Sequence, residues 1–82
     1  MIQLGTVGRI SSGDDSGKFV KIQKLPDDPP SFLILIAHDR EFRHGYGDYW
    51  VEDYGSLQEF FREGQWVVQW LEPEEELGGG RS

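Results

Sequence analysis

The strongest constraint on the fold of this chain is one uninterrupted apolar run, residues 32–37 (FLILIA). Pro29 and Pro30 precede the run, and the polar segment 38–41 follows it. An apolar side chain at every position predicts a strand that is buried on both faces, because a strand with one solvated face alternates apolar and polar residues. The run therefore predicts the central strand of a sheet that is covered on both faces or curled around it.

Length and composition limit the kind of protein this can be. The chain has 82 residues and no cysteine, which is the size of one small domain and excludes disulfides, thiolate metal sites and catalysis by cysteine. The N-terminal residues lack the pattern of a signal peptide, and no apolar run reaches the roughly 18 residues of a membrane span. We expect a bacterial-type cytoplasmic protein with one domain over residues 1–71 and an acidic, Gly-rich flexible tail over residues 72–82.

The remaining patterns predict four more strands and one helix. Apolar, aromatic and β-branched residues indicate strands at 2–10, 19–25, 49–54 and 65–71. Turn residues separate them at 11–17, 26–30 and 44–48. In the last strand, Trp66, Val68 and Trp70 share one side.

A capping pattern predicts where the helix begins. Ser56 followed by Glu59 is a capping box, which favours a helix over 56–63 with Leu57, Phe60 and Phe61 on one face. The predicted fold class is therefore α+β: a small, mostly antiparallel sheet in the order β-β-β-β-α-β, with one short helix packed on one face.

Pairing can be predicted for some of the strands. The first two strands should form a hairpin, and the strand at 49–54 should pair antiparallel with the run 32–37. Lysines at 18, 21 and 24 indicate that the second strand is an exposed edge guarded against aggregation.

No pattern in the chain identifies a reaction. The spacing of His38 and His44 fits no compact zinc pattern, and if residues 38–43 continue the strand, the two histidines lie about 20 Å apart, which is too far for one metal ion. No serine lies in a nucleophile elbow, and the glycine pairs at 5–8 and 45–47 lack a phosphate-binding lysine. A hydrolase with paired carboxylates needs a cleft that a domain of this size scarcely offers, so it ranks last. We expect neither an enzyme nor a bound metal or cofactor.

The distribution of charge favours a protein partner. The net charge of −7 disfavours binding to nucleic acid or to an anionic membrane, and residues 25–71 hold nine acidic and three basic side chains. These carboxylates are interleaved with tyrosines and Trp50, and such a mixture suits a basic protein surface. The alternative is that the aromatic residues pack the core and the carboxylates are merely solvated. The predicted contact residues are Asp39, Glu41, Tyr46, Asp48, Glu52, Asp53 and Tyr54, with Glu59 and Glu63 on the helix as secondary candidates.

Three segments of the C-terminal half resemble a known class of proteins. Residues 47–53 (GDYWVED), 56–61 (SLQEFF) and 66–71 (WVVQWL) resemble the small immunity proteins of bacterial polymorphic-toxin and contact-dependent-inhibition systems. The resemblance implies a small, acidic, cytoplasmic protein that neutralises a cognate toxin, often a basic nuclease, by binding and blocking it. The expected function is thus a protein-binding inhibitor. The alternative is a small structural or regulatory module that forms homodimers through a sheet edge.

Overall fold

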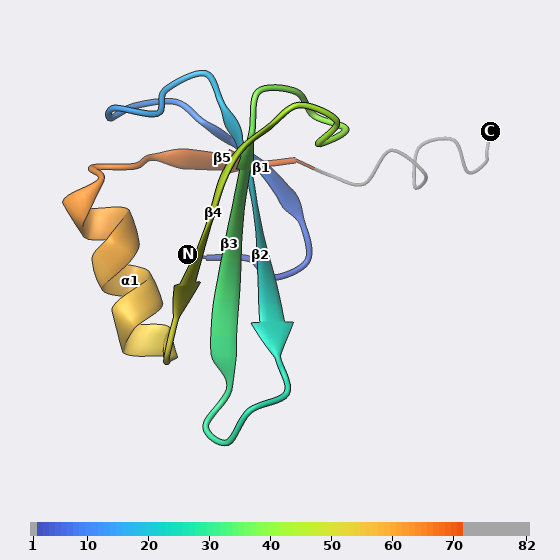
Figure 1. Cartoon of the computed structure of the whole chain (residues 1–82). Helices are drawn as coiled ribbons and strands as arrows, with labels where there is room; N and C mark the ends of the chain where they lie inside the picture. The colour runs from blue at the N-terminus through green and yellow to red at the C-terminus, as the bar shows by residue number, and fades with distance from the viewer. Residues whose placement is uncertain (1, 72–82) are drawn as a thin grey trace, which may run out of the picture.

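The computed structural model describes residues 2–71, which form a five-stranded antiparallel sheet and one helix (Figure 1). The elements are β1 (Val7–Ile10), β2 (Phe19–Leu25), β3 (Ser31–Ala37), β4 (Gly45–Val51), α1 (Tyr54–Glu63) and β5 (Val68–Trp70). The strands lie in the order β4-β3-β2-β1-β5. The predicted α+β class and element order are confirmed, as are the β1–β2 hairpin and the antiparallel β3–β4 pair. The predicted tail, residues 72–82, lies outside the described residues.

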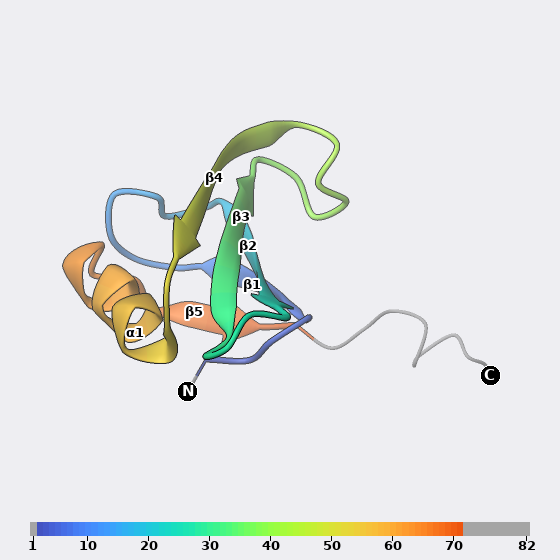
Figure 2. The same cartoon turned by 60° about the horizontal axis from the view of Figure 1, so that its bottom comes forward.

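The sheet curls around a single core. β2, β3 and β4 run side by side, whereas β5 crosses them at a steep angle in both views, and α1 lies beside the end of β4 (Figures 1 and 2). The buried core comprises apolar side chains from β1, β2, β3, the helix and the segment before β5: Ile10, Val20, Ile22, Phe32, Ile34, Ile36, Leu57 and Trp66. Val68 of β5 is partly buried and packs against this core. Curling allows so short a chain to enclose a core with only one helix.

The apolar run is buried on one face more than on the other. Phe32, Ile34 and Ile36 are buried on the inner face of β3, whereas Leu33 and Leu35 on the outer face are half-buried. The prediction of full burial on both faces is therefore wrong for these two leucines. The physical reason is that α1, the one helix among residues 2–71, packs on the inner side, so Leu33 and Leu35 keep contact with solvent.

β2 is the centre of the sheet, and the prediction that its lysines guard an edge is wrong. β1 pairs with β2 on one side and β3 pairs with it on the other. The edges of the described sheet are β4 and β5, because β5 returns to pair with β1. That return pairs two segments about 60 residues apart, and the local pattern of lysines carries no information about such a pairing.

β1 and β5 approach each other closely at Gly8. A Cβ atom on Gly8 would lie 2.4 Å from Cγ1 of Val68 and 2.8 Å from Cε3 of Trp70. β1 is shorter than the predicted 2–10 strand, since Gly5 has a left-handed φ of 74°. β5 is likewise shorter than the predicted 65–71 strand, because only Val68–Trp70 pair with β1. Trp66 is buried and Val67 is 60% exposed, so the two residues do face opposite sides as predicted.

The helix begins two residues earlier than the sequence predicts. Asp53, not Ser56, is the N-cap: its Oδ1 accepts a hydrogen bond of 2.7 Å from the backbone N–H of Ser56. The capping box is thus wrong, and Glu59 pairs with Arg62 instead. The helix face is confirmed, because Leu57 is fully buried while Phe60 and Phe61 pack partly buried against the core.

β4 also differs from its predicted bounds of 49–54. It begins at Gly45, inside the segment predicted as a turn, and it ends at Val51. The turn lies earlier because Asp39 organises residues 39–44, and an irregularity between Ile36 and Ala37 shifts the register where β4 starts. Asp53 ends the extended chain at the other side by capping α1.

Candidate functional site

The nine predicted contact residues lie in four places. Asp39 and Glu41 belong to the loop between β3 and β4, Tyr46 and Asp48 to β4, Glu52 and Asp53 to the link before α1, and Tyr54, Glu59 and Glu63 to α1. The loop and the link lie at opposite ends of β4 (Figure 1). β4 therefore connects these residues, but their side chains do not have equal freedom to contact a partner.

Asp39 is occupied within its own loop. Its carboxylate accepts hydrogen bonds from the backbone N–H groups of His44 at 2.8 Å and Arg43 at 3.1 Å, and it lies 3.5 Å from Nδ1 of His44. Burial raises the pKa of Asp39, but the backbone hydrogen bonds and the nearby His44 outweigh that effect and lower the pKa below its ordinary value. Asp39 thus shapes the loop, whereas Glu41 in the same loop is exposed.

Asp53 and Glu59 also have partners within the domain. The hydrogen bond from the backbone N–H of Ser56, together with one from its side chain, lowers the pKa of Asp53. Glu59 forms an ion pair with Arg62, whose pKa it raises. Tyr54 is 40% exposed and packs edge-on against Phe32, with ring centroids 5.9 Å apart. Glu52 and Glu63 are exposed.

β4 carries one carboxylate, that of Asp48. Asp48 is exposed, and no side chain within residues 2–71 forms a hydrogen bond or an ion pair with it. It faces outward beside Leu35, its partner across the β3–β4 ladder. An acidic side chain without an internal partner is available to a cation from outside the domain.

Trp50 is an exposed aromatic residue that the predicted set of contact residues lacks. It lies two positions after Asp48, pairs with Leu33 across the ladder, and is 58% exposed. The alternation of the strand could have found it, since residues 48 and 50 share one face and residue 49 the other. Tyr49 lies on the other face, where its ring centroid is 5.3 Å from that of Phe60 although the residue remains 45% exposed. We call Asp48, Trp50 and Glu52 together the β4 surface.

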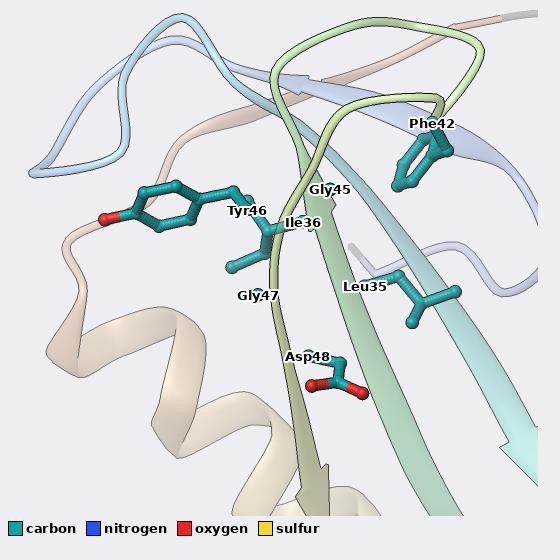
Figure 3. Close-up of a pocket in the computed structure, with 7 residues that line it drawn as sticks. All are labelled: Leu35, Ile36, Phe42, Gly45, Tyr46, Gly47 and Asp48. Atoms are coloured by element: carbon teal, nitrogen blue, oxygen red, sulfur yellow. The ribbon is translucent and has the colours of Figure 1, made fainter.

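Tyr46 is held on the opposite side of β4 from Asp48 (Figure 3). Nζ of Lys18 lies 4.4 Å from the centroid of its ring, and the ring packs edge-on against His38 at 5.2 Å. Tyr46 nevertheless remains 50% exposed. These contacts fix the ring in place while leaving half of it open to a partner.

A groove of about 450 Å³ lies where β4 meets the preceding loop (Figure 3). Its lining residues come from β3, the loop and β4: Leu35, Ile36, Phe42, Gly45, Tyr46, Gly47 and Asp48. Leu35, Phe42 and Asp48 point to the same side of the two strands in Figure 3. The groove thus combines two apolar side chains with one carboxylate.

The described residues contain no feature of a metal centre or of a membrane-spanning helix. No group of three or more His, Asp or Glu side chains within residues 2–71 is placed to hold a metal ion. The helix in that part of the chain is too short and too polar to cross a membrane. A scan against protein-family models gives no match, and comparisons with curated proteins and with solved structures give none either.

Proposed function

We propose that this protein is a protein-binding inhibitor, of the immunity-protein kind, which blocks a basic partner through the β4 surface. The observation that carries the proposal is the exposed pair Asp48 and Trp50 on one face of an edge strand. Large exposed aromatic side chains supply most of the binding energy in many interfaces, and carboxylates beside them steer cationic partners. A net charge of −7 would speed the association further.

The proposed mechanism is occlusion. Asp48 and Glu52 would attract lysine and arginine side chains of the partner, while Trp50 would be buried in the contact. In a basic toxin such as a nuclease, the surface covered would be the one that receives phosphates. The inhibitor needs no chemistry of its own for this function.

The alternative, a module that forms homodimers through a sheet edge, has one observation in its favour. β4 is seven residues long and, within residues 2–71, pairs with a neighbour on one side only. A second copy could add its own β4 there. Two copies that each carry Asp48 on β4 and a net charge of −7 would repel each other, so such a dimer should become stronger as salt is added.

The test uses the whole chain as an immobilised bait in lysate of the source cell at low salt. Captured proteins are identified by mass spectrometry, purified and rebound to the wild type, to D48N/W50A and to the control D14N/V67A. Asp14 and Val67 are also exposed but lie outside β4. We expect one basic protein that loses activity at stoichiometric addition, binds more weakly as salt rises, and is lost only with D48N/W50A.

Two outcomes would contradict the proposal. Equal loss of binding in both double variants would remove the β4 surface from the interface. A native mass that doubles as salt is added, without any basic partner, would favour the homodimeric module.

A further inference from the structure

The groove beside β4 has an amphipathic lining. Leu35 provides an apolar base, Phe42 an aromatic wall and Asp48 a carboxylate, and all three project to one side of the β3–β4 pair (Figure 3). A volume of about 450 Å³ exceeds what a single water molecule fills and lies in the range of small-ligand sites. Such a lining suits a ligand that is apolar along its length and cationic at its tip.

Asp48 is placed unfavourably for the stability of the domain itself. Aspartate is disfavoured in strands, and its neighbour across the ladder is the apolar Leu35. No partner among the described residues offsets this cost. A carboxylate in such a position is explained if a cation from another molecule completes the site.

Phe42 is also in an unfavourable conformation. Its φ of 58° lies in the left-handed region, which residues with bulky side chains rarely adopt. The backbone N–H of Phe42 donates a hydrogen bond of 3.1 Å to the carbonyl of Asp39, and the Asp39 carboxylate fixes the next two residues. The loop thereby holds the ring on the groove side of β4.

We propose that this groove receives an arginine side chain of the basic partner. The methylene groups would lie on Leu35, the guanidinium plane would stack on the Phe42 ring, and its N–H groups would donate to the Asp48 carboxylate. Arginine satisfies all three contacts because its planar cation stacks on aromatic rings and binds carboxylates through two parallel hydrogen bonds. Lysine has a point charge without the plane, and an apolar side chain leaves Asp48 unpaired. The inference rests on the proposed function and identifies what its interface recognises.

The groove can be tested without the partner. The ¹⁵N-labelled full chain is titrated at low salt with N-acetyl-arginine amide, N-acetyl-lysine amide and N-acetyl-citrulline amide, and backbone amide shifts are followed by NMR. Citrulline matches the shape of arginine but carries no charge. We expect the arginine probe to shift the amides of Phe42, Gly47 and Asp48 and to bind more tightly than either of the others.

Two variants make the assignment specific. D48N should weaken the arginine probe about tenfold, because hydrogen bonds between charged groups are stronger than neutral ones by that order. D14N, which removes an exposed carboxylate outside the groove, should leave the affinity unchanged. Both variants should keep the wild-type spectrum elsewhere, since neither carboxylate forms an ion pair within the described residues.

Equal binding of arginine and citrulline, preference for lysine, or shifts outside the groove would each overturn the inference. Its failure can be told apart from failure of the proposed function. If a basic partner is captured through the β4 surface but the arginine probe does not bind, the groove inference fails alone. If the probe binds in the groove but no basic partner is found, the proposed function fails and the groove remains an arginine site.

Discussion

The close approach of β1 and β5 at Gly8 gives a sharp test of how the sheet closes. A Cβ on this residue would lie 2.4 Å from Cγ1 of Val68, more than 1 Å inside the roughly 3.5–4.0 Å that carbon atoms prefer. Trp70 contributes a second close contact at 2.8 Å. Gly8→Ala therefore has to displace β5 from β1, the strand whose pairing completes the curled sheet.

The expected cost of Gly8→Ala is the difference of two effects. Overpacking a tight contact destabilises the folded state by about 1–3 kcal/mol. Alanine has less conformational freedom than glycine in the unfolded chain, which offsets about 0.4–1 kcal/mol of that loss. We expect a net loss of about 1–2 kcal/mol in the free energy of unfolding, from a total of about 4–10 kcal/mol for a domain of this size. Urea unfolding followed by tryptophan fluorescence measures it.

A double-mutant cycle identifies the cause. Val68→Ala removes the Cγ1 atom that the new methyl group would meet, so the double variant G8A/V68A should be more stable than the sum of the single effects predicts, by about 1 kcal/mol. Gly45→Ala is the matched control, since a Cβ there meets nothing within 4 Å. Additive effects in the cycle, or a Gly8→Ala variant as stable as the wild type, would refute the argument.

Three further predictions concern stability. Asp48→Thr should raise the free energy of unfolding by up to about 1 kcal/mol and weaken binding of the partner, because threonine suits a strand but offers no charge. Urea unfolding measures the change in stability, and a destabilised variant would contradict the prediction. Leu57→Ala should lower the free energy of unfolding by about 2–5 kcal/mol, since Leu57 is fully buried. The control Gln58→Ala, at an exposed position of the same helix, should lower it little. Equal losses in the two variants would show that Leu57 does not anchor α1. Backbone and side-chain hydrogen bonds from Ser56 lower the pKa of Asp53 below its unfolded value of 3.8. The ionised carboxylate therefore stabilises the folded domain above that pH, and this stabilisation is lost as the pH falls through the folded pKa. Asp53→Asn should thus destabilise the domain at pH 6, and this destabilisation should shrink as the pH falls through the folded pKa. A difference in Tm between variant and wild type that does not change with pH would exclude this linkage.

Local patterns in the sequence determined most of the elements. The apolar run became β3, the alternation of Trp66 with Val67 fixed which side of the last strand faces the core, and the spacing of Leu57 fixed the buried side of α1. These properties depend on residues a few positions apart, because apolar residues on one face repeat every 3.6 residues in a helix and every two residues in a strand. The α+β class follows from them.

The cap and the start of β4 needed the structure. Asp53 and Ser56 are both good N-cap residues, and the choice depended on where the chain leaves β4. Likewise, the glycines and the tyrosine at 45–47 are compatible with a turn or with a strand. They form a strand because the hydrogen bonds of Asp39 close the loop before residue 45. Both the position of the N-cap and the start of β4 therefore depend on neighbouring segments rather than on the intrinsic preferences of the residues themselves.

Only the tertiary structure decided which charges are free. The sequence shows nine acidic residues between 25 and 71, but not that Asp39 and Asp53 accept backbone hydrogen bonds while Asp48 has no partner among the described residues. Nor does it show that β2 is central and β4 an edge. Strand neighbours and side-chain partners are set by contacts between segments far apart in the chain, whereas local preference acts over a few residues.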